Sequence, residues 1–424
     1  MNKDEIVLPK EDIPKQFYNI AADLPVPLPP PMGDLSILGK IFPKEILRQE
    51  MSTERFIPIP EQVRELYSKI GRPTPLYRAR RLEKALNTPA HIYFKREDTT
   101  FSGSHKLNTA LAQAYYIAQE GFEHVTTETG AGQWGSALAL ASMFFGLECK
   151  VYMVRCSFDQ KPYRKHIMAM YGAQVVSSPS TGTAAGRAIL EKDPDCTGSL
   201  GIAISEAIEE AAQDPTTVYS LGSVLNHVLL HQTVLGQETQ KQFEIAGEDP
   251  DFLIGCVGGG SNFSGFTFPF LRDVFAKRSD TRMIGVEPVE VPSMTKGEYR
   301  YDYGDTAKQT PLMKMHTLGC EYIPDPIYAG GLRYHGVAPL VSLLKERGFI
   351  EAEAYSQAEC FEAARLFAKT EGIISAPESA HAIRSTIVHA MEAKKTGEKK
   401  VIAFNLSGHG LLDMDGYAKV LGLR

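Results

Sequence analysis

The sequence predicts an α/β protein built on mostly parallel sheets. Apolar segments of strand length alternate along the chain with segments whose apolar residues recur at helical spacing. Three of the apolar segments end in glycine-rich turns, at 130–135, 258–260 and 407–410. Apolar strands that alternate with helices are typical of parallel sheets covered by helices on both faces.

The expected elements follow in chain order from residue 61. Helices are expected where apolar residues recur every three or four positions, and strands where short apolar runs are bounded by turn residues. The expected helices cover residues 61–70, 109–119, 136–145, 161–171, 225–245, 263–275, 357–370 and 378–392. The expected strands cover residues 91–95, 125–128, 149–154, 174–177, 252–257, 283–286 and 400–406.

Two stretches depart from this alternation. Residues 24–31 read Leu-Pro-Val-Pro-Leu-Pro-Pro-Pro. Proline fixes φ and removes a donor, so we expect an extended segment that wraps over the body, docks on a neighbouring subunit or is a mobile tail. Residues 288–334 are rich in glycine and proline and poor in periodicity, which predicts a functional loop or a disordered one.

The composition is that of an ordinary globular protein and argues against two classes of partner. Of the 424 residues, 43% are hydrophobic and 23% charged. The length predicts two or three domains and favours two well-packed ones. The net charge of −6 and the lack of a basic block give no support to a nucleic-acid or anionic-membrane partner. The charged N-terminus lacks the apolar core of a signal peptide, and no apolar run reaches the roughly 18 residues of a membrane span. Six scattered cysteines without zinc-site spacing predict reduced, buried thiols in the cytoplasm.

A lysine lies where an expected strand gives way to an expected helix. Residues 101–108 read Phe-Ser-Gly-Ser-His-Lys-Leu-Asn, with Ser102 and Ser104 as candidate N-caps. The free N–H groups of a helix start favour an anion such as a phosphate. Lys106 could form a Schiff base beside such a site once its pKa is lowered. On its own, a lysine in this position is more often a solvated surface residue.

The turn that follows the expected strand 252–257 has the features of a phosphate site. Gly258, Gly259 and Gly260 allow backbone N–H groups to converge on an anion, and Ser261 and Asn262 add side-chain donors. The turn matches neither a Walker A loop nor a dinucleotide-binding motif. The alternative is a flexible glycine turn.

Two further turns offer polar groups at strand ends. The first turn, Thr129-Gly130-Ala131-Gly132-Gln133, has hydroxyl, amide and backbone donors that could hold a carboxylate. Glu128, directly before this turn, could transfer a proton or could be a solvated residue at the end of the strand. Ser407, after the last expected strand, could bond a heteroaromatic nitrogen or belong to a tight turn. Because the ligand site of an open parallel sheet lies at the carboxyl ends of its strands, all three turns could line one crevice.

These groups together fit pyridoxal phosphate. That cofactor requires a Schiff-base lysine, a phosphate site and a partner for its ring nitrogen. A neutral hydroxyl as that partner leaves the nitrogen largely unprotonated, which suits β-elimination and β-replacement better than transamination.

Five runs carry a resemblance to a known family. They are GSHKLNTALA at 103–112, ETGAGQWGSALA at 128–139, GCVGGGSN at 255–262, EGIISAPESAHA at 371–382 and LSGHG at 406–410. In this order they resemble the tryptophan synthase β-chain family, within the fold-type II pyridoxal-phosphate enzymes. Trp134 and the proline-containing N-terminus are similar to the second, divergent β-chain type.

The resemblance implies a role for each candidate residue. Lys106 would bear the cofactor and remove the Cα proton, and Glu128 would lie near indole. The cofactor would also contact His105, Gly258, Gly259, Gly260, Ser261, Asn262, Glu378 and Ser407, while Thr129, Gly130, Ala131, Gly132 and Gln133 would hold the substrate carboxylate. Carbonyls of Gly258, Tyr334 and Gly336 would be candidates for a sodium or potassium site.

The implied reaction is β-replacement, in which indole and serine give L-tryptophan. One departure from the family pattern is Arg333, where the common β-chain carries an aspartate linked to coupling with the α-subunit. We therefore expect weak or absent α-subunit association. Arg333 is either solvated or placed to meet an anionic group, so O-phospho-L-serine is an alternative substrate.

The resemblance also implies the architecture. We expect two three-layer α/β domains with the cofactor between them, one formed by residues 1–71 and 105–230 and the other by 72–104 and 231–424. A homodimer is expected. Two alternatives are another enzyme of the same fold type, such as threonine synthase or cysteine synthase, and a non-catalytic regulatory homologue.

Overall fold

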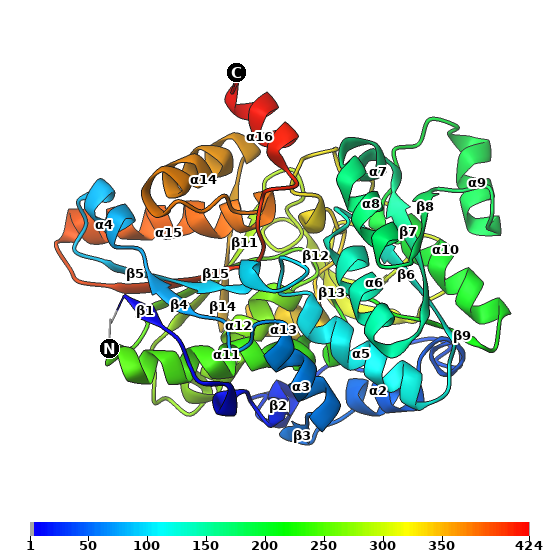
Figure 1. Ribbon diagram of the computed structural model, residues 1–424, viewed down its shortest axis with the longest axis horizontal. Helices are drawn as coiled ribbons and strands as arrows, with labels where there is room; N and C mark the ends of the chain where they lie inside the picture. The colour runs from blue at the N-terminus through cyan, green and yellow to red at the C-terminus, as the bar shows by residue number, and fades with distance from the viewer. Residues whose placement is uncertain (1–3, 424) are drawn as a thin grey trace.

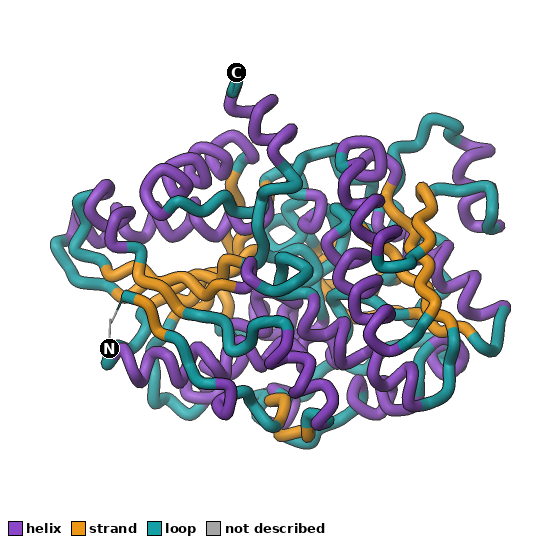
Figure 2. Tube along the Cα trace, viewed as in Figure 1, coloured by secondary structure: helices purple, strands orange, loops and turns teal. Residues whose placement is uncertain are grey.

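Two main sheets organise the protein (Figures 1 and 2). The structure, a computed structural model, describes residues 4–423. The larger sheet has the strand order β1-β4-β5-β15-β10-β11-β14, and the smaller one has the order β8-β7-β6-β9. Two-stranded sheets are formed by β2 with β3 and by β12 with β13.

The strands have the following bounds: β1 Glu5–Ile6, β2 Gln16–Tyr18, β3 Phe56–Pro58, β4 Leu76–Arg78, β5 His91–Arg96, β6 His124–Thr129, β7 Glu148–Val154, β8 Gln174–Ser178, β9 Thr217–Tyr219, β10 Phe252–Cys256, β11 Arg282–Pro288, β12 Glu298–Tyr303, β13 Leu312–Thr317, β14 Ile350–Tyr355 and β15 Val401–Leu406. Every strand expected from the sequence is confirmed, with ends that differ by at most two residues. In both main sheets the pairings are parallel except at β4, which pairs antiparallel with β5 and β1.

The helices have the following bounds: α1 Leu38–Ile41, α2 Lys44–Glu50, α3 Glu61–Lys69, α4 Arg80–Leu86, α5 Leu107–Gln119, α6 Gln133–Phe145, α7 Arg155–Gln160, α8 Pro162–Met170, α9 Ala184–Lys192, α10 Leu200–Gln213, α11 Asn226–Ala246, α12 Ser261–Phe275, α13 Pro339–Glu346, α14 Gln357–Glu371, α15 Pro377–Thr396 and α16 Met414–Leu421. Short 3-10 helices cover η1 Lys10–Asp12, η2 Ile20–Ala22, η3 Glu97–Thr99 and η4 Gly330–Leu332. All eight helices expected from the sequence are present.

Helices cover the sheets in layers. Figure 1 shows α14 and α15 on one face of the larger sheet and α11, α12 and α13 on the other. The smaller sheet packs against α6 and α10, which both contact β6 and β7. Parallel strands buried in this way explain the apolar runs of the sequence, such as Phe252–Cys256, which is buried throughout.

Strands far apart in the sequence meet in the larger sheet. β5 pairs with β15, so that Phe94 lies opposite Phe404. The first strand, β1, pairs with β4, and a strand from the range 1–71 therefore lies in the larger sheet. The domain boundaries given above remain a prediction.

Three expectations need correction. Helix α5 begins after Lys106 itself, and Ser102 donates to the carbonyl of Ser104 rather than capping the helix. The stretch 288–334 contains the hairpin β12–β13, whose first strand is polar and aromatic and whose second has its apolar residues interrupted by Lys314. Leu24 and residues 26–31 line an apolar cavity on the body of the protein, so the mobile-tail alternative is wrong for this segment.

Among residues 4–423, the structure contains no helix that combines the length and apolar character needed to cross a membrane.

Candidate active site

Lys106 is held at the junction of the two sheets. It is the N-cap residue of α5, which follows β5 of the larger sheet and leads to β6 of the smaller one. Burial lowers the pKa of the Lys106 amine, while the nearby carboxylates of Glu378 and Glu128 oppose this shift. A buried amine with a lowered pKa is a better nucleophile toward a carbonyl than a solvated one, because more of it is unprotonated.

The residue before Lys106 connects this turn to the end of β15. The His105 N–H donates to the Ser407 carbonyl at 3.0 Å, and the His105 ring lies 3.4 Å from Ser261 Oγ through Nε2. Burial, the largest cause, lowers the pKa of His105 to about 3. The imidazole is therefore neutral at pH 7 and can contribute one N–H donor.

The glycine turn 258–260 lies between β10 and α12, directly beside Lys106. A Cβ on Gly259 would lie 2.1 Å from Ser223 Oγ, and one on Gly258 would lie 2.3 Å from the Gly331 carbonyl oxygen. Gly260 has φ +108°, in the left-handed region that favours glycine. Close approach and backbone conformation thus both require glycine here, and the turn presents the first N–H groups of α12 to the cavity.

Asn262 has a structural role in the same turn. Its Nδ2 donates to the Cys256 carbonyl at 3.1 Å, and its Oδ1 accepts from Asn405 Nδ2 at 2.5 Å. Because its side chain is engaged with β10 and β15, its backbone N–H is the group available to an anion.

Glu128 lies near the end of β6, deep in the protein. It is 5% exposed, so the solvated alternative is wrong. The Tyr219 hydroxyl donates to Glu128 Oε2 at 2.5 Å. Burial raises the pKa of Glu128 to about 7, although the Tyr219 bond favours the charged form. A carboxyl group with this pKa can both accept and donate a proton near neutral pH.

The turn after Glu128 packs closely against η4. A Cβ on Gly130 would lie 2.7 Å from the Gly330 carbonyl oxygen, and Gly132, the N-cap of α6, has φ +90°. Gln133 Nε2 donates to Glu378 Oε2 at 3.2 Å. Glu378 Oε1 in turn accepts from the Gly331 N–H at 2.8 Å, so this carboxylate connects α6, α15 and η4.

Ser407 presents its hydroxyl to the same region. Its Oγ lies 2.6 Å from Ser379 Oγ and 3.6 Å from Cys256 Sγ. Burial raises the pKa of the Cys256 thiol to about 12, so the thiol is neutral at pH 7. The surroundings of the Ser407 hydroxyl are thus hydroxyls and a neutral thiol.

One cavity brings most of the candidate residues together. Its lining contains His105, Lys106, Gln133, Gly258, Gly259, Gly260, Ser261, Asn262, Glu378 and Ser407. Thr129, Gly130, Ala131 and Gly132 are not among the residues that line it, and Gly130 borders a neighbouring small cavity with Arg333.

Four residues of the lining were not predicted from the sequence: Ser223, Cys256, Gly331 and Leu332. Cys256 could have been found, because it ends the strand before the glycine turn. Gly331 and Leu332 come from the long stretch without periodicity, and Ser223 carries no local signal.

Arg333 lies beside this region rather than in solvent. It is 5% exposed, so the solvated alternative is wrong. Its Nη1 donates to Cys156 Sγ at 2.7 Å and its Nη2 to Ser157 Oγ at 2.6 Å. Both partners are on α7, and no carboxylate among residues 4–423 forms an ion pair with Arg333. Its charge is available to an anion at the Gly130 side of the site.

The donor set fits pyridoxal phosphate. The cavity supplies a buried amine, a glycine turn closed to any Cβ and a hydroxyl at a strand end. These groups match the aldehyde, the phosphate and the ring nitrogen of that cofactor.

The fold-type II arrangement and the cavity that contains Lys106, the glycine turn and Ser407 define a class of protein: the enzymes that use pyridoxal phosphate. The chain belongs to the pyridoxal-phosphate dependent enzyme family, whose pattern matches residues 67–408. Within that class it belongs to the tryptophan synthase beta chain family. It is 58% identical to a "Tryptophan synthase beta chain" of Thermococcus gammatolerans over 98% of this chain and 96% of that protein.

Two further relatives carry the name "Tryptophan synthase beta chain 2". The protein from Pyrococcus furiosus is 58% identical over 98% of this chain and 95% of its own length. The protein from Methanothermobacter thermautotrophicus is 57% identical over 99% of both chains. The resemblance to the second β-chain type is thus confirmed.

Solved structures share the fold. Threonine deaminase isoform 2 from Solanum lycopersicum superposes with a TM-score of 0.62 at 20% identity, covering 98% of each chain. A fungal L-serine ammonia-lyase from Rhizomucor miehei gives a TM-score of 0.60 at 18% identity, over 82% of this chain and 97% of that one.

Proposed function

We propose that this protein forms L-tryptophan by pyridoxal-phosphate-dependent β-replacement. Indole and L-serine give L-tryptophan and water, and O-phospho-L-serine as the donor gives inorganic phosphate in place of water. The observation that carries the proposal is the buried Lys106 amine, which shares one cavity with a glycine turn suited to a phosphate. Relatives named tryptophan synthase beta chain, matched over nearly the whole chain, support the reaction.

The cofactor's contribution is general: its ring accepts the electrons that remain when a proton leaves the substrate Cα. The chain's own groups hold it in place. Lys106 bears the cofactor and takes the Cα proton, and its lowered pKa fits both tasks. His105 and the turn Gly258–Asn262 bind the phosphate, and Ser407 faces the ring nitrogen.

The substrates are held on the side of the smaller sheet. Residues 129–133 bind the amino-acid carboxylate through N–H groups at the start of α6. Glu128 lies against indole, where a carboxyl group with a pKa of about 7 can take the N–H proton as carbon C3 attacks. Its burial excludes water that would compete with indole for the reactive intermediate.

Several finer assignments belong to the same proposal. Carbonyls of Gly258, Tyr334 and Gly336 hold a monovalent cation, two copies of the chain form a homodimer, and an α-subunit binds weakly or not at all. Six free cysteines, five of them buried, support a cytoplasmic location. The alternative of a threonine synthase or cysteine synthase activity is less favoured, because the relatives over the whole chain are tryptophan synthases.

The first test is an absorbance spectrum of the purified protein with pyridoxal phosphate, followed by serine or O-phosphoserine and then indole. We expect a visible band that Lys106→Ala abolishes, a new band with a productive amino-acid donor, and loss of that band with tryptophan formation on adding indole. A colourless protein would support the non-catalytic alternative, and consumption of the intermediate by sulfide or water but not indole would overturn the proposed substrate.

A further inference from the structure

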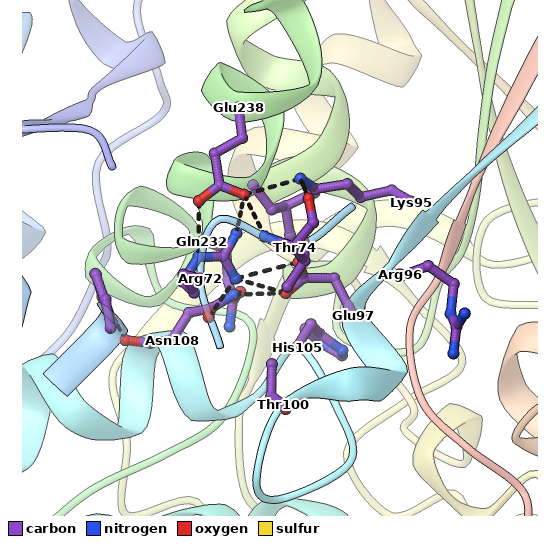
Figure 3. Close-up of polar contacts among 12 residues, drawn as sticks. Arg72, Thr74, Lys95, Arg96, Glu97, Thr100, His105, Asn108, Gln232 and Glu238 are labelled. Atoms are coloured by element: carbon purple, nitrogen blue, oxygen red, sulfur yellow. Dashed lines mark hydrogen bonds and ion pairs between the residues drawn. The ribbon is translucent and has the colours of Figure 1, made fainter. Parts of the chain in front are cut away.

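A polar network lies buried behind the first turn of α5, and Figure 3 shows its members converging on Arg72. Its cations, Arg72 and Lys95, and its carboxylates, Glu97 and Glu238, have side chains that are 0% exposed. Arg72 Nη2 donates to Glu238 at 2.8 Å and Nη1 to Glu97 at 2.9 Å. Lys95 Nζ donates to Glu238 at 2.8 Å. Each charge therefore has a partner of opposite sign, which a buried ionic group requires.

Asn108 connects this network to α5. Its Oδ1 accepts from Arg72 Nη1 at 2.8 Å, and its Nδ2 donates to Glu97 Oε2 and to Gln232 Oε1, both at 3.0 Å. The Tyr67 hydroxyl donates to the Asn108 carbonyl at 2.7 Å. Hydrogen bonds to charged groups are stronger than neutral ones, so this amide is fixed from three sides.

The same turn of α5 faces the cofactor cavity on its other side. Asn108 is two residues after Lys106, and both Lys106 and His105 line the cavity. Within the described part of the chain, the Lys106 N-cap position makes no side-chain capping hydrogen bond. First turns without such a cap depend on other contacts to stay ordered. The His105 N–H supplies one such contact, to the Ser407 carbonyl, and the Asn108 side chain supplies three more.

The network also affects the pKa of His105 in the cofactor cavity. Glu97 is among the groups that act on His105, where its negative charge opposes the lowering of the pKa by burial and by Lys106. Removing charges from water is costly, and a buried ionic cluster often stabilises a protein no better than apolar packing does. Its position directly behind Lys106 points to a role in orienting the turn.

We propose that Asn108 is a positioning residue for Lys106, holding the first turn of α5 against the Arg72–Glu97 pair so that the amine faces the cofactor. The proposal rests on the proposed function, because it requires pyridoxal phosphate on Lys106. It adds a residue outside the cavity, reached through the helix backbone.

The chain offers a matched control in Gln242 on α11. Like Asn108, Gln242 is a fully buried amide with three hydrogen bonds in this network. It accepts from Lys95 Nζ at 2.9 Å and donates to the carbonyls of Ile6 and Thr74, both at 2.9 Å. Gln242→Ala therefore removes an equivalent set of contacts, on the side of the network away from α5.

The test compares wild-type protein, Asn108→Ala and Gln242→Ala, each purified with pyridoxal phosphate. Three quantities are measured: the melting temperature without cofactor, the dissociation constant of the cofactor, and the pH at which its visible band changes. We expect both variants to melt at lower temperatures. Only Asn108→Ala should bind the cofactor about tenfold more weakly and shift the pH midpoint of the band, because only there is Lys106 displaced.

Equal cofactor dissociation constants and equal pH midpoints in the two variants would overturn the inference and leave the network a purely structural one. If Asn108→Ala does not fold, Tyr67→Phe replaces it, since that change removes only the hydroxyl that donates to the Asn108 carbonyl. A smaller shift in the same direction would support the inference, and wild-type values would overturn it. Failure of the wild-type protein itself to bind the cofactor would instead overturn the proposed function.

Discussion

At the scale of single residues, the site depends on ionisable groups placed away from water. Glu128 and His105 are buried, Lys106 is partly exposed where it lines the cavity, and loss of solvent around the ionisable group is the largest influence on the pKa of each. It makes the lysine easier to deprotonate, the carboxyl group harder to ionise and the imidazole neutral. Each change suits the role proposed for that group.

The protonation of Glu128 is expected to lower kcat/KM at acidic pH. If its carboxylate takes the indole proton, kcat/KM should fall as the pH drops below about 7, where the carboxyl group becomes protonated. Glu128→Gln should lower kcat/KM for indole roughly 10²- to 10⁴-fold and abolish the fall of kcat/KM at acidic pH. Steady-state rates from pH 5.5 to about 9 measure both effects, and an unchanged pH limb in the variant would exclude Glu128 as the base.

Arg333 is expected to set the choice of amino-acid donor. With its guanidinium directed at α7 hydroxyl and thiol groups rather than a carboxylate, it is available to the phosphate of O-phosphoserine. Arg333→Gln should lower kcat/KM for O-phosphoserine by about tenfold or more and change the value for serine little. An equal loss for both donors would identify a purely structural role in holding α7.

At the scale of elements, the burial of apolar residues explains which strands could be predicted from the sequence. Strands such as Phe252–Cys256 are apolar because helices cover both faces, and their ends were predicted to within two residues. The edge strand β14, Ile350–Tyr355, was missed because half-exposed positions allow polar residues. The helix α10, Leu200–Gln213, was missed although its spacing of apolar residues is helical. Ser223 and Leu332 reach the site only through tertiary packing, so local patterns could not reveal them.

The glycine turn between β10 and α12 should not accept a side chain at its centre. In Gly259→Ala the new Cβ would lie 2.1 Å from Ser223 Oγ and 2.7 Å from Val224 Cγ2, so the turn must move. We expect cofactor affinity to fall by about tenfold or more, consistent with an overpacking cost of about 1–3 kcal/mol. Fluorescence titration of the cofactor measures this loss.

The control for that change is Gly39→Ala in α1. An added Cβ there would meet no atom of residues 4–423 within 4 Å. It should leave cofactor affinity unchanged. Equal affinities for the two variants would show that the close approach at Gly259 is not needed for binding.

At the scale of the whole molecule, the buried charges make the free energy of unfolding depend on pH. The charge of Arg72 holds the pKa of Glu97 at about 2 against the opposing effect of burial, compared with an ordinary value of 4.5. A lowered carboxyl pKa stabilises the folded state above the unfolded value, and the stabilisation is lost as the pH falls through the folded one.

The free energy of unfolding should therefore fall by about 3 kcal/mol from this group as the pH drops from about 4.5 to about 2. Urea unfolding at a series of pH values measures the slope. Glu97→Gln should be less stable at pH 7 and should show a shallower decline in this range. The same decline in both proteins would assign the acid sensitivity to other carboxylates.

The pairing of β5 with β15 has a consequence for the growing polypeptide. These strands lie side by side in the larger sheet, yet Val401–Leu406 is synthesised long after His91–Arg96. In the turn after β15, the Ser407 carbonyl accepts from the His105 N–H, and the His409 N–H donates to the Gly103 carbonyl. Until β15 and the turn after it have been synthesised, the side of the cavity that Ser407 provides is missing. We therefore expect the cofactor to be captured only after β15 has been made, and a nascent chain stalled before β15 should emerge colourless.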